Sequence, residues 1–180
     1  MNKTKQWVVT VILLLGSIVI YSSTLNRHNK ESIQTETYDK VGTIISGSFD
    51  ESKLKSKEEW QRILTKEQYH ILQERGTEIP YSGSLNKEDR PGTYYSHGCD
   101  VALFRSEQKY DSGTGWPSFT APISEDALVL RAESGFGDNR IEVLDPCGGH
   151  LGHVFDDGPL PLGKRYCMNS VALRFVPDVQ

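Results

Sequence analysis

Cysteine is scarce in this 180-residue chain, and the three that occur, Cys99, Cys147 and Cys167, limit its chemistry. Three cysteines cannot all pair with one another, so either one thiol is free or none is bridged. They are also too few for an all-cysteine structural zinc site, which takes four thiolates. The composition, with 16 Gly, 8 Pro and 37% hydrophobic residues, excludes a wholly disordered or fibrous chain and suits one compact domain.

An excess of positive charge is also absent. The chain has 20 Lys and Arg against 24 Asp and Glu, a net charge of -4. Residues 1–55 carry 7 basic against 5 acidic side chains, a net +2, whereas residues 56–180 carry 13 against 19, a net -6. Because affinity for nucleic acid comes mostly from neutralising phosphates, the acidic body predicts no nucleic-acid partner.

One long apolar run occupies the N-terminus. Residues 7–21 are uncharged and almost wholly apolar, after a polar start that contains Lys3 and Lys5. Such a run is typical of a signal-peptide core or of a short membrane span. No small-x-small cleavage site follows it, so we assign residues 1–25 to an N-terminal membrane anchor, with a cleaved signal peptide as the alternative. Both interpretations predict an extracytoplasmic domain, in the periplasm or the cell envelope.

The rest of the chain divides into a polar linker, residues 26–55, and a folded domain, residues 56–180. The linker has one apolar cluster, which predicts a single short ordered piece: Val41, Ile44, Ile45 and Phe49. In the domain, Ser56 and the acidic pair after it predict a helix start, and a second helix is expected over Lys66–Arg75, ended by Gly76. Short apolar runs between Gly, Pro, Asp and Ser clusters then predict a mainly β body of antiparallel strands. These runs are 93–95, 101–104, 127–130, 141–144, 153–155 and 171–176.

Two segments near the C-terminus carry reactive side chains. In RYCMNS (165–170), Cys167 lies close to Arg165, whose charge favours the nucleophilic thiolate; the alternative is a buried structural cysteine. In HLGHVF (150–155), the two histidines lie three apart, which on a strand means opposite faces unless a bulge intervenes, and bulges favour glycine. One histidine then suits an acid or charge partner of Cys167, and the alternative is a hydrogen-bonded structural pair. Metal ligation would use His97, Cys99, Cys147 and His150.

The segment YDSGTGWPSF (110–119) holds Trp116 between Gly and Pro. A large apolar residue in such a loop either packs back onto the core or lines a pocket. Taken in order, with their separations, this segment, HLGHVF and RYCMNS resemble B-type methionine sulfoxide reductases, over about Ser56 to Pro177. The resemblance implies an Mss4-like fold, in which two antiparallel sheets form an open barrel-like body with two short N-terminal helices. It implies a peptide-methionine (R)-S-oxide reductase that repairs oxidised proteins, or free methionine sulfoxide.

The resemblance also assigns roles. Cys167 is the nucleophile that attacks the sulfoxide sulfur and becomes a sulfenic acid, and Arg165 favours its thiolate. His153 supplies a proton or positions water. Trp116 receives the substrate methyl group, and Phe155 extends this apolar wall. The remaining polar side of the site is completed by His150 and Asn169.

Two departures from the family pattern affect cofactors and partners. Thr114 stands where many members have a resolving cysteine, so the sulfenic acid must be reduced by Cys99, by Cys147 or by an external thiol such as a thioredoxin-like protein. Many members also hold zinc with two CxxC pairs, of which this chain keeps one cysteine each. We therefore expect no metal or other cofactor, and a Cys99–Cys147 disulfide in place of zinc, which suits an oxidising compartment.

Two other classes of function compete with this one. In a non-catalytic Mss4-like binding module, Trp116 and Phe155 would form an aromatic ligand pocket and Cys167 would be incidental. A pocket of that kind needs neither Arg165 nor two histidines, which argues against it. A cysteine–histidine hydrolase would need an oxyanion-hole signature, and none stands out.

Overall fold

The computed structural model describes residues 42–133 and 140–179, so the predicted anchor and most of the predicted linker lie outside it. The compact body begins at Gly42 and includes residues 42–55, which the sequence assigned to the linker. The ordered piece expected there is strand β1 (Gly42–Ser46), which pairs antiparallel with β6 (Val129–Glu133). Among the described residues, no helix combines the length and apolarity needed to cross a membrane.

Two short helices precede most of the strands, and both begin at a capping box. For α2 (Lys57–Ile63), the Glu59 backbone N–H donates to Ser56 Oγ, and the Ser56 N–H donates to the Glu59 carboxylate. For α3 (Lys66–Leu72), Thr65 is the N-cap residue and forms the same kind of capping box with Gln68. These reciprocal bonds satisfy backbone donors that no earlier helical turn can reach, which fixes both helix starts.

Helix α3 ends earlier than the sequence predicts. The prediction was Arg75, with Gly76 as the terminator, whereas the helix ends at Leu72. Arg75 itself takes the left-handed conformation, with φ 60°, and its guanidinium bonds Glu142 and Glu133 in the larger sheet. A long-range ion pair that local sequence does not reveal therefore accompanies the early helix end.

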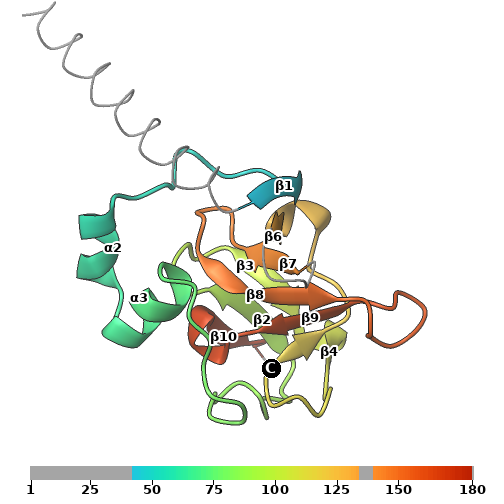
Figure 1. Ribbon diagram of the computed structural model, residues 1–180. Helices are drawn as coiled ribbons and strands as arrows, with labels where there is room; N and C mark the ends of the chain where they lie inside the picture. Colours follow the sequence, from blue (N-terminus) through green and yellow to red (C-terminus); the bar gives the residue numbers. More distant parts are fainter. Residues whose placement is uncertain (1–41, 134–139, 180) are drawn as a thin grey trace, which may run out of the picture. The chain divides into compact units, whose positions relative to one another are not determined.

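The strands form two antiparallel sheets (Figure 1). The larger sheet has the order β1-β6-β7-β8-β9-β5-β4, and the smaller has the order β10-β2-β3. The predicted fold class, a mainly β body of two antiparallel sheets with two short helices, is confirmed. The remaining strands are β2 (Gly92–Ser96), β3 (Ala102–Arg105), β4 (Lys109–Tyr110), β5 (Ser118–Phe119), β7 (Ile141–Leu144), β8 (His150–Phe155), β9 (Arg165–Met168) and β10 (Leu173–Pro177). Three 3-10 turns complete the body: η1 (Ser106–Gln108), η2 (Glu125–Ala127) and η3 (Ser170–Ala172).

Aromatic packing joins the two sheets. Phe104 of β3 stacks on Phe119 of β5 with ring centroids 4.2 Å apart, and Tyr94 of β2 meets Phe119 edge-on at 4.9 Å. Such pairs add to the free energy gained by burying their area. Trp60 from α2 and Leu72 from α3 are buried in the same core, and α3 packs against β8 and η3. Helix α3 thus packs against the middle of the larger sheet, at β8.

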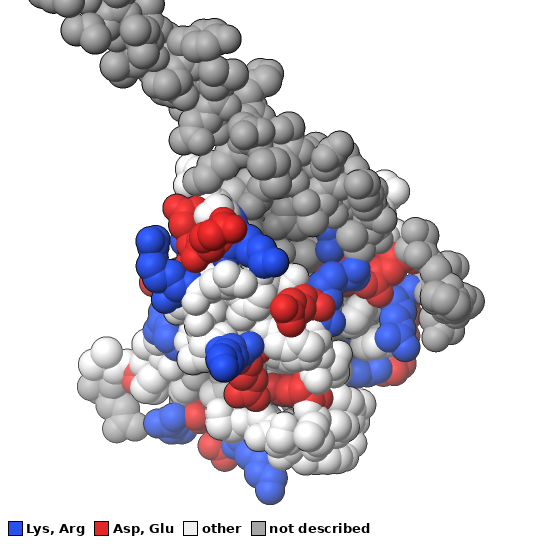
Figure 2. All heavy atoms as spheres, turned by 60° about the vertical axis from the view of Figure 1, so that its left-hand side comes forward, with Lys and Arg blue, Asp and Glu red and all other residues white. Residues whose placement is uncertain are grey.

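Charges of both signs are interspersed on the surface. On the face shown in Figure 2, Lys and Arg side chains lie among Asp and Glu side chains rather than in one continuous area. Ion pairs of the described residues include Lys164–Asp156, Arg165–Asp157 and Arg174–Asp100.

Candidate active site

A row of polar side chains crosses the larger sheet from strand to strand. Arg131 on β6 pairs with Glu142 on β7, and Glu142 pairs with His153 on β8. His153 pairs with Cys167 on β9, and Cys167 pairs with Ser118 on β5. Directly opposed residues of antiparallel strands point to the same face and lie close together. The register therefore places Cys167 between a histidine and a serine.

Strand alternation adds two more of the predicted residues to this face. Residues two apart on a strand share a face, so Phe155 lies on the side of His153, and Arg165 lies on the side of Cys167. Phe155 and Arg165 are register partners, and the guanidinium carbon lies 4.3 Å from the centre of the Phe155 ring. The residues between them on these strands, such as Val154, belong to the core. The structure thus brings together four residues that the sequence proposed separately.

The bulge that the histidine spacing requires is present. Leu144 on β7 pairs with His150, and Val143 pairs with Gly152, so that Leu151 is the extra residue on β8. The imidazole rings of His150 and His153 consequently lie 5.3 Å apart, centroid to centroid. A Cβ at Gly152 would overlap the carbonyl group of Cys167, so glycine is what permits the close approach of β8 to β9.

Glu142 organises the buried end of the row. Its carboxylate accepts hydrogen bonds from Arg131 at 2.6 Å and Arg75 at 3.0 Å, and lies 2.7 Å from His150 Nδ1. Burial alone would raise the pKa of Glu142, but the bonds to His150 and Arg75 outweigh it and lower the pKa to about 2. The ionised carboxylate orients the His150 ring. The other ring nitrogen, Nε2, is buried and has no hydrogen-bond partner within the described part of the chain.

His153 is held in its neutral form. Its Nε2 lies 3.1 Å from the Glu133 carboxylate. Burial, followed by the charge of His150, lowers the pKa of His153 to about 4. At neutral pH the ring therefore carries one proton and no charge. This favours positioning and hydrogen bonding over donation from a preformed imidazolium.

Cys167 is the free thiol among the three cysteines, and it is half-buried. Burial raises the pKa of this thiol, while the Arg165 charge and hydrogen bonds from Thr114 and Ser118 act in the opposite direction without cancelling it. Arg165 thus acts in the predicted direction, but burial has the larger effect. Its guanidinium is shared with Asp157, through bonds of 2.7 and 2.8 Å. The resting site holds mainly the thiol at neutral pH.

Trp116 is fixed beside this row by its polar edge. The indole N–H donates to the carbonyl of Glu78 at 3.2 Å, and the Trp116 carbonyl accepts from Ser118 Oγ at 3.2 Å. The side chain is half-buried, so part of the indole surface is accessible. Trp116 thus lies two residues before Ser118, the residue of β5 that opposes Cys167.

Asn169 has a structural contribution that the sequence does not show. It is buried, its Oδ1 accepts from the Glu78 N–H at 3.0 Å, and its amide nitrogen donates to the Leu151 carbonyl at 3.1 Å. Both ends of the amide are therefore occupied by backbone groups. Asn169 ties the segment that supports Trp116 to strand β8, next to Cys167.

Several residues of this site are not indicated by the sequence alone. Glu142 and Glu78 were missed because each is a single acidic residue whose partners are distant in the chain. Ser112 and Ser118 were missed although both lie in YDSGTGWPSF, where two buried or half-buried hydroxyls flank the glycine turn. The signal in the sequence is that the two serines flank Trp116. They were not singled out because the large residues and the glycines of the segment form the more conspicuous pattern.

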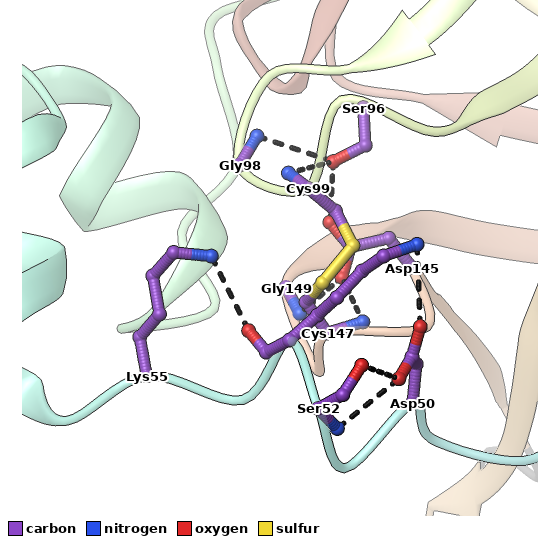
Figure 3. The surroundings of a disulfide bond; sticks show 10 residues. Asp50, Ser52, Lys55, Ser96, Gly98, Cys99, Asp145, Cys147 and Gly149 are labelled. Carbon is purple, nitrogen blue, oxygen red and sulfur yellow. Dashed lines mark hydrogen bonds and ion pairs between the residues drawn. A yellow bond between two sulfur atoms is a disulfide. The ribbon is translucent and has the colours of Figure 1, made fainter.

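A second cluster surrounds the remaining cysteines (Figure 3). Cys99 and Cys147 form a disulfide, with Cα atoms 5.8 Å apart. The Ser96 hydroxyl bonds the buried Asp145 carboxylate, which also accepts from the backbone N–H groups of Cys147 at 3.0 Å and Gly149 at 2.8 Å. Burial raises the pKa of Asp145. The disulfide and the Ser96–Asp145 hydrogen bond join the turn after β2 to the turn after β7.

The metal set considered from the sequence is not gathered here. His97 Nε2 lies 2.8 Å from the Gln68 amide, and His150 is bound to Glu142. The metal-type group within the described residues is Cys99, Asp145 and Cys147, whose ligand atoms lie within 4.8 Å of one another. Structural zinc takes four ligands, with the cysteines as thiolates, whereas these two sulfurs are bonded to each other. The residues present do not fit a zinc ion in this state.

Comparison with known proteins agrees with the geometry. A SelR domain matches residues 64–177. Peptide methionine sulfoxide reductase MsrB of Methanosarcina barkeri is 53% identical over 122 residues, covering 67% of this chain and 86% of that protein. The protein of the same name from Leptospira interrogans is 49% identical over 122 residues, covering 67% and 93%. Methionine-R-sulfoxide reductase B2, mitochondrial, of Rattus norvegicus is 47% identical over 142 residues, covering 74% and 82%.

The matched region includes the whole polar row from Ser118 to Cys167 and all three motifs. Identity near one half over most of both chains accompanies the placement of a free cysteine opposite a histidine. The chain belongs to the SelR-domain family of B-type methionine sulfoxide reductases.

Proposed function

We propose that this chain reduces methionine-(R)-sulfoxide in proteins to methionine, with Cys167 as the nucleophile. The observation that carries the proposal is the register of β8 and β9, which sets the free thiol of Cys167 directly opposite His153. Arg165 and Phe155 share that face. A non-catalytic aromatic pocket would not require a free thiol held between an imidazole and a guanidinium, so that alternative is not favoured.

The reaction balances with the thiol as it stands. The Cys167 sulfur attacks the sulfoxide sulfur, the oxygen passes to Cys167, and methionine leaves as the thioether. The enzyme is left as Cys167 sulfenic acid. One proton must reach the oxygen, and the thiol proton supplies it. The raised pKa of Cys167 therefore keeps on the sulfur the proton that the reaction consumes.

The site has an apolar side for the substrate methyl group and a polar side for hydrogen bonding. Trp116 and Phe155 offer apolar surface to the methyl group, and Phe155 is further fixed by the guanidinium over its ring. On the polar side, neutral His153 shares its one ring proton with Glu133, so its other nitrogen accepts a hydrogen bond and positions a water molecule next to Cys167. His150 supports it, because its buried Nε2 is open to a hydrogen bond and Glu142 orients its ring.

We propose that an external thiol, such as a thioredoxin-like protein, regenerates Cys167. Two thiols return the sulfenic acid to the thiol, giving one disulfide and one water. Support comes from the pairing of Cys99 with Cys147, because in this state neither has a free thiol to attack Cys167. Thr114 adjoins Cys167 but has only a hydroxyl group, which cannot form a disulfide.

We propose that the Cys99–Cys147 disulfide takes the structural part that zinc plays in other members of the family. The Ser96–Asp145 hydrogen bond supports this, since it links the same two turns. Metal analysis of the purified, unreduced chain should find less than one zinc per ten molecules, and mass spectrometry should find one alkylatable thiol. A stoichiometric metal with three alkylatable thiols would contradict the proposal.

We propose that the domain works outside the cytoplasm, attached to a membrane by residues 1–25 or exported by them as a signal peptide. The apolar run at residues 7–21 supports this, as does a disulfide in the body, because disulfides persist mainly in oxidising compartments. Fractionation of cells that express the full chain should place it in the envelope. Recovery in the cytosolic fraction would argue against the proposal.

The catalytic proposal is tested by trapping its intermediate. The full chain is incubated with a peptide carrying methionine-(R)-sulfoxide, and a sulfenic-acid reagent such as dimedone is added without reductant. We expect an adduct on Cys167 with the R epimer and none with the S epimer. Formation of methionine without any adduct on Cys167 would refute its role.

A further inference from the structure

Three hydroxyl groups form a continuous chain behind the Cys167 sulfur. Thr114 Oγ1 lies 4.0 Å from Cys167 Sγ and 2.8 Å from Ser112 Oγ. Ser112 Oγ lies 2.7 Å from Ser118 Oγ, which donates to the Trp116 carbonyl at 3.2 Å. Ser118 is fully buried, and it opposes Cys167 in the register. The chain therefore begins at the reacting sulfur and ends at the backbone of the residue that is proposed to hold the substrate methyl group.

A hydroxyl donates one hydrogen bond and can accept others, so this chain has two complete directions. With Cys167 as a thiol, its S–H points to Thr114, Thr114 donates to Ser112, Ser112 donates to Ser118, and Ser118 donates to the Trp116 carbonyl. With Cys167 as a thiolate, the three hydroxyl groups rotate. Ser118 then donates to Ser112, Ser112 to Thr114, and Thr114 to the negative sulfur. No heavy atom needs to move between the two states.

We infer that Thr114, Ser112 and Ser118 are positioning residues that form a reversible hydroxyl chain, serving the Cys167 sulfur in both of its protonation states. The inference rests on the proposed role of Cys167 as the nucleophile. Thr114 acts on the sulfur directly and Ser112 acts through Thr114, while Ser118 both joins the hydroxyl chain through Ser112 and bonds the sulfur itself. Hydrogen bonds to an ionised group are stronger than those between neutral groups, so the chain favours the thiolate that forms during attack.

Other groups also act on the same sulfur, and their effects must be distinguished from the effect of the hydroxyl chain. Arg165, on the strand of Cys167, stabilises the thiolate and is itself paired with Asp157. His153 faces the sulfur from β8 and is neutral near pH 7. Tyr110, from β4, carries a pKa raised mainly by burial, so it is also neutral in that range. Hydroxyl substitutions change none of these charges.

The test measures the rate of alkylation of Cys167 by iodoacetamide, from pH 6 to 11, in the unreduced full chain. Because Cys99 and Cys147 are bonded to each other, the reagent reports on one thiol. Thr114→Val removes the hydroxyl and keeps the shape, whereas Thr114→Ser keeps the hydroxyl. Thr120→Val is the matched control, since the Thr120 hydroxyl donates to the Gln108 carbonyl and is not part of the hydroxyl chain.

We expect Thr114→Val to move the midpoint of the alkylation profile to higher pH and to slow alkylation at pH 7 by roughly three- to tenfold. Thr114→Ser and Thr120→Val should stay within about twofold of the parent rate. Ser112→Ala should slow alkylation less than Thr114→Val does. Combining the two substitutions should add nothing to the effect of Thr114→Val, because Ser112 acts on the sulfur through Thr114 and loses that link once the Thr114 hydroxyl is removed.

Two results would overturn the inference. One is an unchanged profile for both Thr114→Val and Ser112→Ala. The other is a Thr114→Ser profile shifted as far as that of Thr114→Val, which would assign Thr114 a packing role. Should Thr114→Val fail to fold, the Ser112→Ala profile against the parent decides the question. Loss of the proposed catalytic role would show separately, as turnover by Cys167→Ser.

Discussion

Glu142 is the group on which the buried half of the site depends. Its side chain is 0% exposed and faces Arg75, Arg131 and His150. Replacement by glutamine keeps the size of the side chain and removes the charge. We expect Glu142→Gln to destabilise the fold strongly and to lower activity, because His150 loses the carboxylate that orients it.

The size of the loss follows from two independent arguments. The pKa of Glu142 falls from its ordinary 4.5 to about 2 on folding, and at ~1.4 kcal/mol per unit this stabilises the fold by about 3 kcal/mol at neutral pH. Breaking a buried ion pair by removing one partner typically costs about 3–5 kcal/mol. We therefore expect Glu142→Gln to lose about 3 kcal/mol of unfolding free energy at pH 7.

The assay is urea unfolding of the full chain, followed by circular dichroism, at several pH values. A depressed carboxyl pKa stabilises the fold above the unfolded value of 4.5, and this stabilisation disappears as the pH falls toward 2. The difference between parent and Glu142→Gln should shrink over that window. Glu107→Gln, which removes a carboxylate exposed on the surface, should leave the unfolding midpoint unchanged. A loss below about 1 kcal/mol for Glu142→Gln at pH 7 would refute the reasoning.

Three further predictions concern other parts of the domain. Cys99→Ser should lower the unfolding free energy by about 4 kcal/mol, because the disulfide to Cys147 closes a loop of 48 residues. Dithiothreitol should reproduce this loss in the parent. An equal unfolding midpoint with and without reductant would contradict the prediction. The pKa of His153 is about 4 in the folded chain and 6.5 when unfolded, so the unfolded chain binds more protons between these values and this residue should contribute a loss of about 2 kcal/mol from pH 7 to pH 5. His153→Gln should lose less over the same interval, and equal losses would exclude the effect. Trp116→Leu should lower kcat/KM for the sulfoxide peptide by about tenfold, since an apolar side chain replaces a fixed indole surface, and steady-state kinetics with unchanged kcat/KM would remove Trp116 from the substrate pocket.

Features encoded locally were predictable from the sequence. The start of α2 at Ser56 follows from its capping box, and most strands coincide with the short apolar runs. The bulge between the two histidines was foreseen as a condition for their meeting, because Gly152 lies between them. In each case the signal lies within a few residues of the feature that it predicts.

Features that depend on register or on distant partners were not predictable in the same way. The row from Arg131 to Ser118 exists only because five strands align without slipping, and no single strand contains that information. The early end of α3 accompanies the ion pair of Arg75 with Glu142, which is 67 residues away. The direction of the pKa shift of Cys167 was also not predictable, because the sequence shows the nearby Arg165, which lowers the pKa, but not the burial that raises it.

The most direct test of the account is the reduction of separated R and S epimers of a peptide methionine sulfoxide by the full chain. Dithiothreitol serves as the reductant, and Cys167→Ser is assayed beside the parent. The account predicts turnover of the R epimer alone, abolished in Cys167→Ser. Turnover that persists in Cys167→Ser, or equal reduction of both epimers, would contradict it.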